Sequence, residues 1–76
     1  MNIEILSPEK SLFSGEVKVL TLPGTSGSFS ILDDHAPLIS TLEKGNISID
    51  SGKEVIAIER GVVEVLQNKV IVLVQA

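Results

Sequence analysis

Residues 54–74 of the chain, EVIAIERGVVEVLQNKVIVLV, decide the fold class. Valine and isoleucine dominate this stretch, and their branched Cβ atoms favour extended backbone over helix. The run 54–66 is apolar on both faces, and the run 70–74 is apolar throughout. Such runs are typical of central strands that are covered on both sides, or of strands that turn one side to a partner. The stretch therefore predicts a β-sheet.

Three segments upstream alternate apolar with polar residues: NIEIL at 2–6, EVKV at 16–19 and NISID at 46–50. A period of two residues is the pattern of a half-buried strand. It turns Val17 and Val19 inward in the second segment, and it turns Ile47 and Ile49 inward in the third. No segment shows a sustained 3.6-residue apolar stripe with helix caps, so the predicted class is all-β.

Turn residues separate these runs at short intervals. Gly24 and Gly27 bracket an exposed turn, Gly45 stands between two strands, and Gly52 lies in the hairpin sequence DSGKE. We expect a positive φ at Gly45 and Gly52, where a tight connection requires one. Because such short intervals leave no room for crossover helices, we predict a small antiparallel β-sandwich or flattened barrel of about eight to ten short strands. Residues 1–76 are predicted to form this one domain.

The composition narrows the classes of function. Hydrophobic residues make up 43% of the 76 residues, which is more apolar surface than so small a domain easily buries, so some side chains are expected to face a partner. The net charge is −4 and the six basic residues are scattered, whereas nucleic-acid binding requires a basic cluster. We expect no nucleic-acid partner. The two aromatic residues, Phe13 and Phe29, are predicted to belong to the core.

The polar residues indicate no catalytic or metal site. Asp33, Asp34 and His35 are consecutive, and consecutive side chains on a strand point to opposite faces, so they do not make a cluster of metal ligands. We therefore expect no cofactor, no metal and no catalytic residue. Two interpretations stay open at this point: a lipoyl- or biotinyl-type carrier domain with its modified lysine at Lys53, or a generic β-sandwich adaptor.

The order of five motifs along the chain resembles a known family, the epsilon subunit of F-type ATP synthases, called delta in mitochondria. The motifs are SPEKSLFSGEV at 7–17, LPGTSGSF at 22–29, HAPLI at 35–39, LEKGNI at 42–47 and GVVEVLQNKVIVL at 61–73. The resemblance implies a non-catalytic β-sandwich at the foot of the central stalk, which packs on the gamma subunit, rests on the membrane c-ring and turns with both. Such a subunit couples proton-driven rotation to ATP synthesis. It is peripheral at the cytoplasmic face of the bacterial inner membrane, which it reaches only through the complex.

The resemblance also implies contact residues. Ser7, His35 and Ser40 match positions that face gamma in the family, and Ser26 and Ser28 match the loop that rests on the c-ring. Acidic residues are common in the family at the last two positions. Serine at both positions in this chain weakens any charge-pair contribution to the c-ring contact.

The chain departs from the family at three further places. Asp34 stands where a glycine usually precedes the histidine, and Ser30 stands where a glycine commonly follows the phenylalanine, so the resemblance does not fix the local turn geometry. Typical members continue into a two-helix C-terminal domain that can inhibit ATP hydrolysis, whereas this sequence ends at Ala76. The resemblance therefore implies a short form that lacks this helical hairpin.

Overall fold

The computed structural model describes all residues from 1 to 76 and contains nine β-strands and no helix. The predicted all-β class and number of strands are confirmed. The structure contains no helix that is long and apolar enough to span a membrane. The strands are β1 (Asn2–Leu6), β2 (Ser11–Glu16), β3 (Val19–Gly24), β4 (Gly27–Leu32), β5 (Leu38–Leu42), β6 (Gly45–Ile49), β7 (Glu54–Ile58), β8 (Arg60–Leu66) and β9 (Lys69–Gln75).

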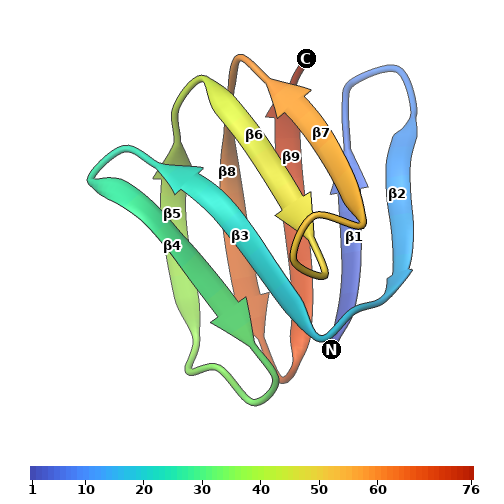
Figure 1. Ribbon diagram of the computed structural model, residues 1–76, viewed down its shortest axis with the longest axis vertical. Helices are drawn as coiled ribbons and strands as arrows, with labels where there is room; N and C mark the ends of the chain where they lie inside the picture. Colours follow the sequence, from blue (N-terminus) through green and yellow to red (C-terminus); the bar gives the residue numbers. More distant parts are fainter.

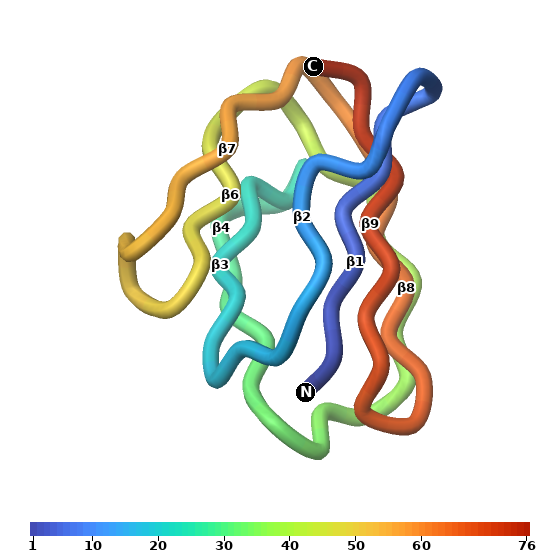
Figure 2. The backbone as a smooth tube through the Cα atoms, turned by 90° about the vertical axis from the view of Figure 1, so that its right-hand side faces the viewer, coloured from blue at the N-terminus to red at the C-terminus, as the bar shows by residue number.

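One hydrogen-bonded sheet runs through the molecule in the order β2-β1-β9-β8-β5-β3-β6-β7, and β4 pairs with β3 beside it. The sheet curls back on itself, so that β2, β1, β9, β8 and β5 form one layer and β4, β3, β6 and β7 form the other (Figure 1, Figure 2). A single residue pair, Gly24 with Leu42, joins β3 to β5 where the sheet turns between the layers. The pairing is antiparallel as predicted, except that β1 runs parallel to β9.

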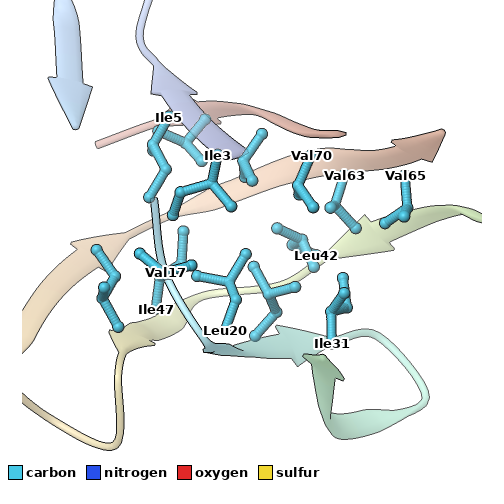
Figure 3. Packing of buried hydrophobic residues seen from close by; sticks show 14 of the residues in the cluster. Ile3, Ile5, Val17, Leu20, Ile31, Leu42, Ile47, Val63, Val65 and Val70 are labelled. Atoms are coloured by element: carbon cyan, nitrogen blue, oxygen red, sulfur yellow. The ribbon is translucent and has the colours of Figure 1, made fainter. Parts of the chain in front are cut away.

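The core lies between the two layers and consists of apolar side chains. It contains 16 buried hydrophobic residues in one cluster, with no polar or charged residue buried among them. Ile3 from one layer and Ile47 from the other point into this shared space (Figure 3). Ile49 is also buried, which confirms the predicted alternation of residues 46–50. Phe13 and Phe29 pack against the cluster but are only partly buried.

The structure corrects the predicted phase of residues 16–19. Val17 is buried, but Val19 is half-buried and turned outward because the next residue, Leu20, takes the inward position. The reason is a bend before β3, where the Asp50 carboxylate accepts the N–H groups of Lys18 at 2.8 Å and Val19 at 3.2 Å. These two donors, Lys18 first, lower the pKa of Asp50 below its ordinary value. The bend shifts the alternation by one residue.

The run 54–66 forms two strands rather than one. It breaks at Glu59, whose N–H donates to the Gln75 carbonyl oxygen at 2.7 Å, and there the chain crosses from one layer to the other. β8 and β9 lie inside their layer, as predicted, whereas β7 is the outermost strand of its own layer. A run that is apolar on both faces does not show where the chain crosses between layers. The prediction of a central strand was therefore wrong for β7.

Glycine is needed at four positions for two different reasons: a positive φ angle, or a lack of space for a Cβ. Gly27 and Gly52 have φ angles of 126° and 99°, a left-handed region that side chains with a Cβ rarely adopt. The predicted positive φ at Gly45 is wrong. A Cβ at Gly45 would instead lie 2.8 Å from the Pro23 Cβ, so this position needs glycine because two strands approach closely. A Cβ at Gly24 would likewise lie 2.7 Å from the Gly27 carbonyl oxygen.

Candidate interaction surface

The outward side of the layer β1, β9, β8 and β5 carries exposed apolar side chains. Four large ones are exposed there: Ile39 by 72%, Leu66 by 54%, Leu73 by 53% and Val62 by 38%. The half-buried side chains of Leu6 and Ile71 also occupy outward positions, since cross-strand partners share a face. By the same pairing, Glu4 and Glu64 flank Ile71 on this side, and Glu64 separates it from Ile39. We call this surface the apolar face and define it by Leu6, Ile39, Val62, Leu66, Ile71 and Leu73.

A continuous row crosses four strands near one end of the apolar face. Leu6 pairs with Leu73, Leu73 with Val62, and Val62 with Thr41. An open groove of about 700 Å³ follows this row, and Pro8 lines its margin. At its polar end, the Arg60 guanidinium donates through Nε to the Gln75 side-chain oxygen at 2.8 Å. An apolar centre with a polar margin is the usual composition of a protein–protein contact.

The outward side of the other layer is different in kind. We call it the hydroxyl face and define it by five outward residues on β3, β4 and β6: Thr21, Ser28, Ser30, Asn46 and Ser48. Thr21 and Ser30 share a hydrogen bond of 2.8 Å between their hydroxyl oxygens. Two exposed apolar side chains, Leu32 and Val55, also belong to this layer, but they lie on its two outermost strands.

Ser7, His35 and Ser40 do not come together in the structure. β1 and β5 run in the same direction, so Ser7, which follows β1, lies at one end of the layer, and His35, which precedes β5, lies at the other. Ser40 lies between them on β5, but its side chain is half-buried on the inward side, opposite Val63. Exposed Ile39 is the neighbour that reaches the apolar face.

Two contacts hold the loop that carries His35, one from the N-terminal residue and one from the β8–β9 turn. The Met1 ammonium donates to the Asp33 carboxylate, a contact that raises the pKa of the ammonium above its ordinary value. The Asp34 N–H donates to the Asn68 side-chain oxygen at 2.9 Å, and Asp34 has a φ of 63°. Asp34 therefore adopts the left-handed turn conformation for which glycine is the usual residue.

Ser7 and the two residues predicted to contact the c-ring lie at the opposite end from His35. The Ser7 hydroxyl donates to the Lys10 carbonyl oxygen at 3.1 Å, as in an ordinary turn after β1. Ser26 and Ser28 are exposed on either side of Gly27, at the tip of the β3–β4 hairpin. The structure thus brings this pair together on one projecting loop (Figure 1).

The apolar face contains residues that the sequence prediction did not name. Val62, Leu66 and Leu73 belong to the runs that are apolar on both sides, and that pattern was the signal of a partner-facing strand. To locate the surface that faces the partner, one must also know the order of the strands in the sheet. No three side chains of His, Asp or Glu gather at one place to hold a metal ion. Lys53 is exposed in the β6–β7 turn.

The family model and the curated relatives that match this chain point to the same family. The family model described as "ATP synthase, Delta/Epsilon chain, beta-sandwich domain" matches residues 1–76. The ATP synthase epsilon chain of Leptospira borgpetersenii is 44% identical over 75 residues, which cover 96% of this chain and 59% of that one. The epsilon chain of Campylobacter fetus is 42% identical over 77 residues, or 97% of this chain and 60% of that one. The chain thus spans about three fifths of the length of these relatives.

Two solved structures share the fold. One is a chain of the Tetrahymena thermophila mitochondrial ATP synthase, in a cryo-EM structure of the central stalk and c-ring, with a TM-score of 0.86 and 17% identity over 99% of this chain and 63% of that one. The other is a chain of the Euglena gracilis mitochondrial ATP synthase, with a TM-score of 0.85 and 16% identity over 97% of this chain and 49% of that one. At such low identity the likeness is one of fold.

Proposed function

Because this chain belongs to the family of ATP synthase delta and epsilon chains, as their β-sandwich domain, we propose that it is a non-catalytic part of the central stalk of a rotary ATP synthase. It links the gamma subunit to the membrane c-ring and couples proton-driven rotation to ATP synthesis. Its place is peripheral, at the cytoplasmic face of a bacterial inner membrane, and it meets the membrane only through the complex.

The apolar face carries the proposal of a gamma contact. Exposed leucine, isoleucine and valine side chains on adjacent central strands are costly to leave in water, and a partner that covers them removes that cost. Gamma is that partner. Ser7 and His35 form the polar margin of the contact at the two ends of the layer, whereas Ser40 points inward and contributes only by supporting its neighbour Ile39.

The tip of the β3–β4 hairpin carries the proposed c-ring contact. Ser26 and Ser28 are uncharged and exposed, so they meet the polar loops of the c-ring by hydrogen bonds and shape rather than by ion pairs. The rest of the domain is suited to transmit torque. Short turns connect nine strands, so few backbone torsions are free to absorb a twist.

The test is a calorimetric titration of purified gamma subunit with this chain, followed by reconstitution of the central stalk on c-rings. We expect saturable one-to-one binding to gamma, and recruitment of the chain to c-rings that depends on gamma. Absence of binding to gamma would overturn the proposal. An intact mass that includes a lipoyl or biotinyl adduct on Lys53 would instead support the carrier-domain alternative.

A further inference from the structure

The tip of the β3–β4 hairpin is weakly attached to the rest of its own layer. β4 pairs with β3 alone, and β3 pairs with β6 only at Leu20 and Thr21, near the start of the strand. From Leu22 onward, β3 has no partner in β6. Gly45 of β6 still packs against Pro23, but no ladder pair joins β6 to the tip, and a two-stranded ribbon is held poorly by its own hydrogen bonds alone.

The hydrogen bonds that attach the tip lead to β5, in the other layer, and to the residue that follows β5. The Thr25 N–H donates to the Thr41 carbonyl oxygen at 3.2 Å, and the Glu43 N–H donates to the Pro23 carbonyl oxygen at 2.8 Å. The hydroxyl oxygens of Thr25 and Thr41 are 3.0 Å apart and share a hydrogen bond. This hydroxyl pair is the side-chain hydrogen bond that crosses between the hairpin tip and β5.

Thr41 also belongs to the apolar face. It is the outward residue opposite Val62 on β8, and it lines the groove beside Leu73. A partner that covers this groove removes water from around the Thr25–Thr41 hydroxyl pair. Hydrogen bonds strengthen when the surrounding dielectric falls, because water no longer competes for the donor and acceptor.

On the premise that the proposed function holds, we propose that Thr25 and Thr41 are positioning residues that couple the apolar face to the hairpin tip. Gamma bound on the apolar face tightens the Thr25–Thr41 contact and thereby orders Ser26 and Ser28 for the c-ring. By thermodynamic reciprocity, a tip held by the c-ring favours the arrangement that binds gamma. The two contacts of the domain are then energetically linked.

Hydrogen exchange followed by mass spectrometry tests this coupling on the hairpin tip, with and without saturating gamma. The variants are Thr25→Val and Thr41→Val, which keep the shape but remove the hydroxyl. Thr25→Ser restores a hydroxyl and serves as the rescue. Thr21→Val is the matched control, since it removes a hydroxyl pair of similar length that stays inside the hairpin.

We expect gamma to slow exchange at the tip of the native chain by about fivefold, the equivalent of one net hydrogen bond. This extra protection should disappear in Thr25→Val and Thr41→Val, persist in Thr21→Val and return in Thr25→Ser. If this hydrogen bond only stabilises the fold, its removal raises exchange equally with and without gamma, and that result would overturn the coupling. Unchanged gamma-induced protection in the valine variants would also overturn it. Failure of the native chain to bind gamma is a separate result that refutes the proposed function.

Discussion

The two outer faces of the sandwich are built by the same alternation of side chains, yet they expose different chemistry. The apolar face presents Val62 and Leu73 on adjacent central strands, whereas the hydroxyl face presents Thr21 and Ser48 at comparable positions. Both layers cover the same core. Packing inside the domain therefore does not account for the difference, and the proposed function attributes it to the gamma contact.

Burial in the core explains only some of the apolar residues in the sequence, because several large ones are exposed. Leu32 and Val55 are as exposed as the leucines of the apolar face, but they lie apart from each other on the two outermost strands of their layer. Single exposed apolar side chains are normal on protein surfaces. Leu6, Leu73 and Val62, in contrast, continue across three adjacent strands, and this continuity is the argument for a contact surface.

The largest expected effect separates the two faces by a matched pair of variants. Val62→Asp places a charge in the centre of the proposed gamma contact, and it should weaken gamma binding by at least about a hundredfold. Val55→Asp places the same charge on an exposed valine of the other layer and should change binding by less than about twofold. Isothermal titration calorimetry measures both. Equal effects at the two valines would abolish the distinction between the faces.

A second variant should damage stability without damaging the apolar face. Gly45→Val brings a Cβ to within 2.8 Å of the Pro23 Cβ, so one of the two strands must shift. We expect a loss of about 1–3 kcal/mol in the free energy of unfolding, measured by urea denaturation. The affinity of the folded fraction for gamma should stay the same. An unaltered urea midpoint would show that the close approach of Gly45 and Pro23 is not restrictive.

His35 tests the margin of the gamma contact. Because it lies at the end of the layer, away from the Leu73–Val62 row, His35→Glu should weaken gamma binding by only about threefold to tenfold. The far-ultraviolet circular dichroism spectrum should keep its β character. Loss of the fold rather than of binding would make His35 a structural residue of its loop, and unchanged affinity would remove it from the contact.

The smallest effect concerns acid stability, and it depends on the bend before β3. The N–H groups of Lys18 and Val19 lower the pKa of Asp50 in the folded state from its ordinary value of 3.8. The carboxylate therefore stabilises the fold above that value, and this contribution is lost as the pH falls through the lower pKa of the folded state. Asp50→Asn, which tolerates the φ of 50° at this position, should lose that part of the pH dependence. Urea midpoints between pH 2 and 6 measure the difference, and identical profiles would contradict it.

Some of this architecture could be predicted from the sequence because it depends on local chemistry. The alternation in residues 46–50 buries Ile47 and Ile49, and Gly52 allows the positive φ of a hairpin, as expected. The apolar surplus predicted that the core does not bury every apolar side chain, and six large ones are exposed; that a partner covers them stays a prediction. The family resemblance was also confirmed by the match over residues 1–76.

The rest depends on contacts between distant residues. Asp50 bends the chain at Lys18 from 32 residues away, and this contact shifts the inward phase after Val17. Gly45 needs to be glycine because of Pro23, on another strand. The apolar face exists only because the sheet order places β9 beside β8 and β1. No pattern within a single run contains that order.

The measurement that tests the central claim most directly is hydroxyl-radical footprinting of the chain, free and bound to gamma. Leu73 and Leu32 are the natural pair, since they are the same residue type, exposed by 53% and 57%, on opposite outer faces. We predict that gamma strongly reduces labelling of Leu73 and leaves labelling of Leu32 unchanged. Protection of Leu32 with unchanged labelling of Leu73 would contradict the claim that the apolar face binds gamma.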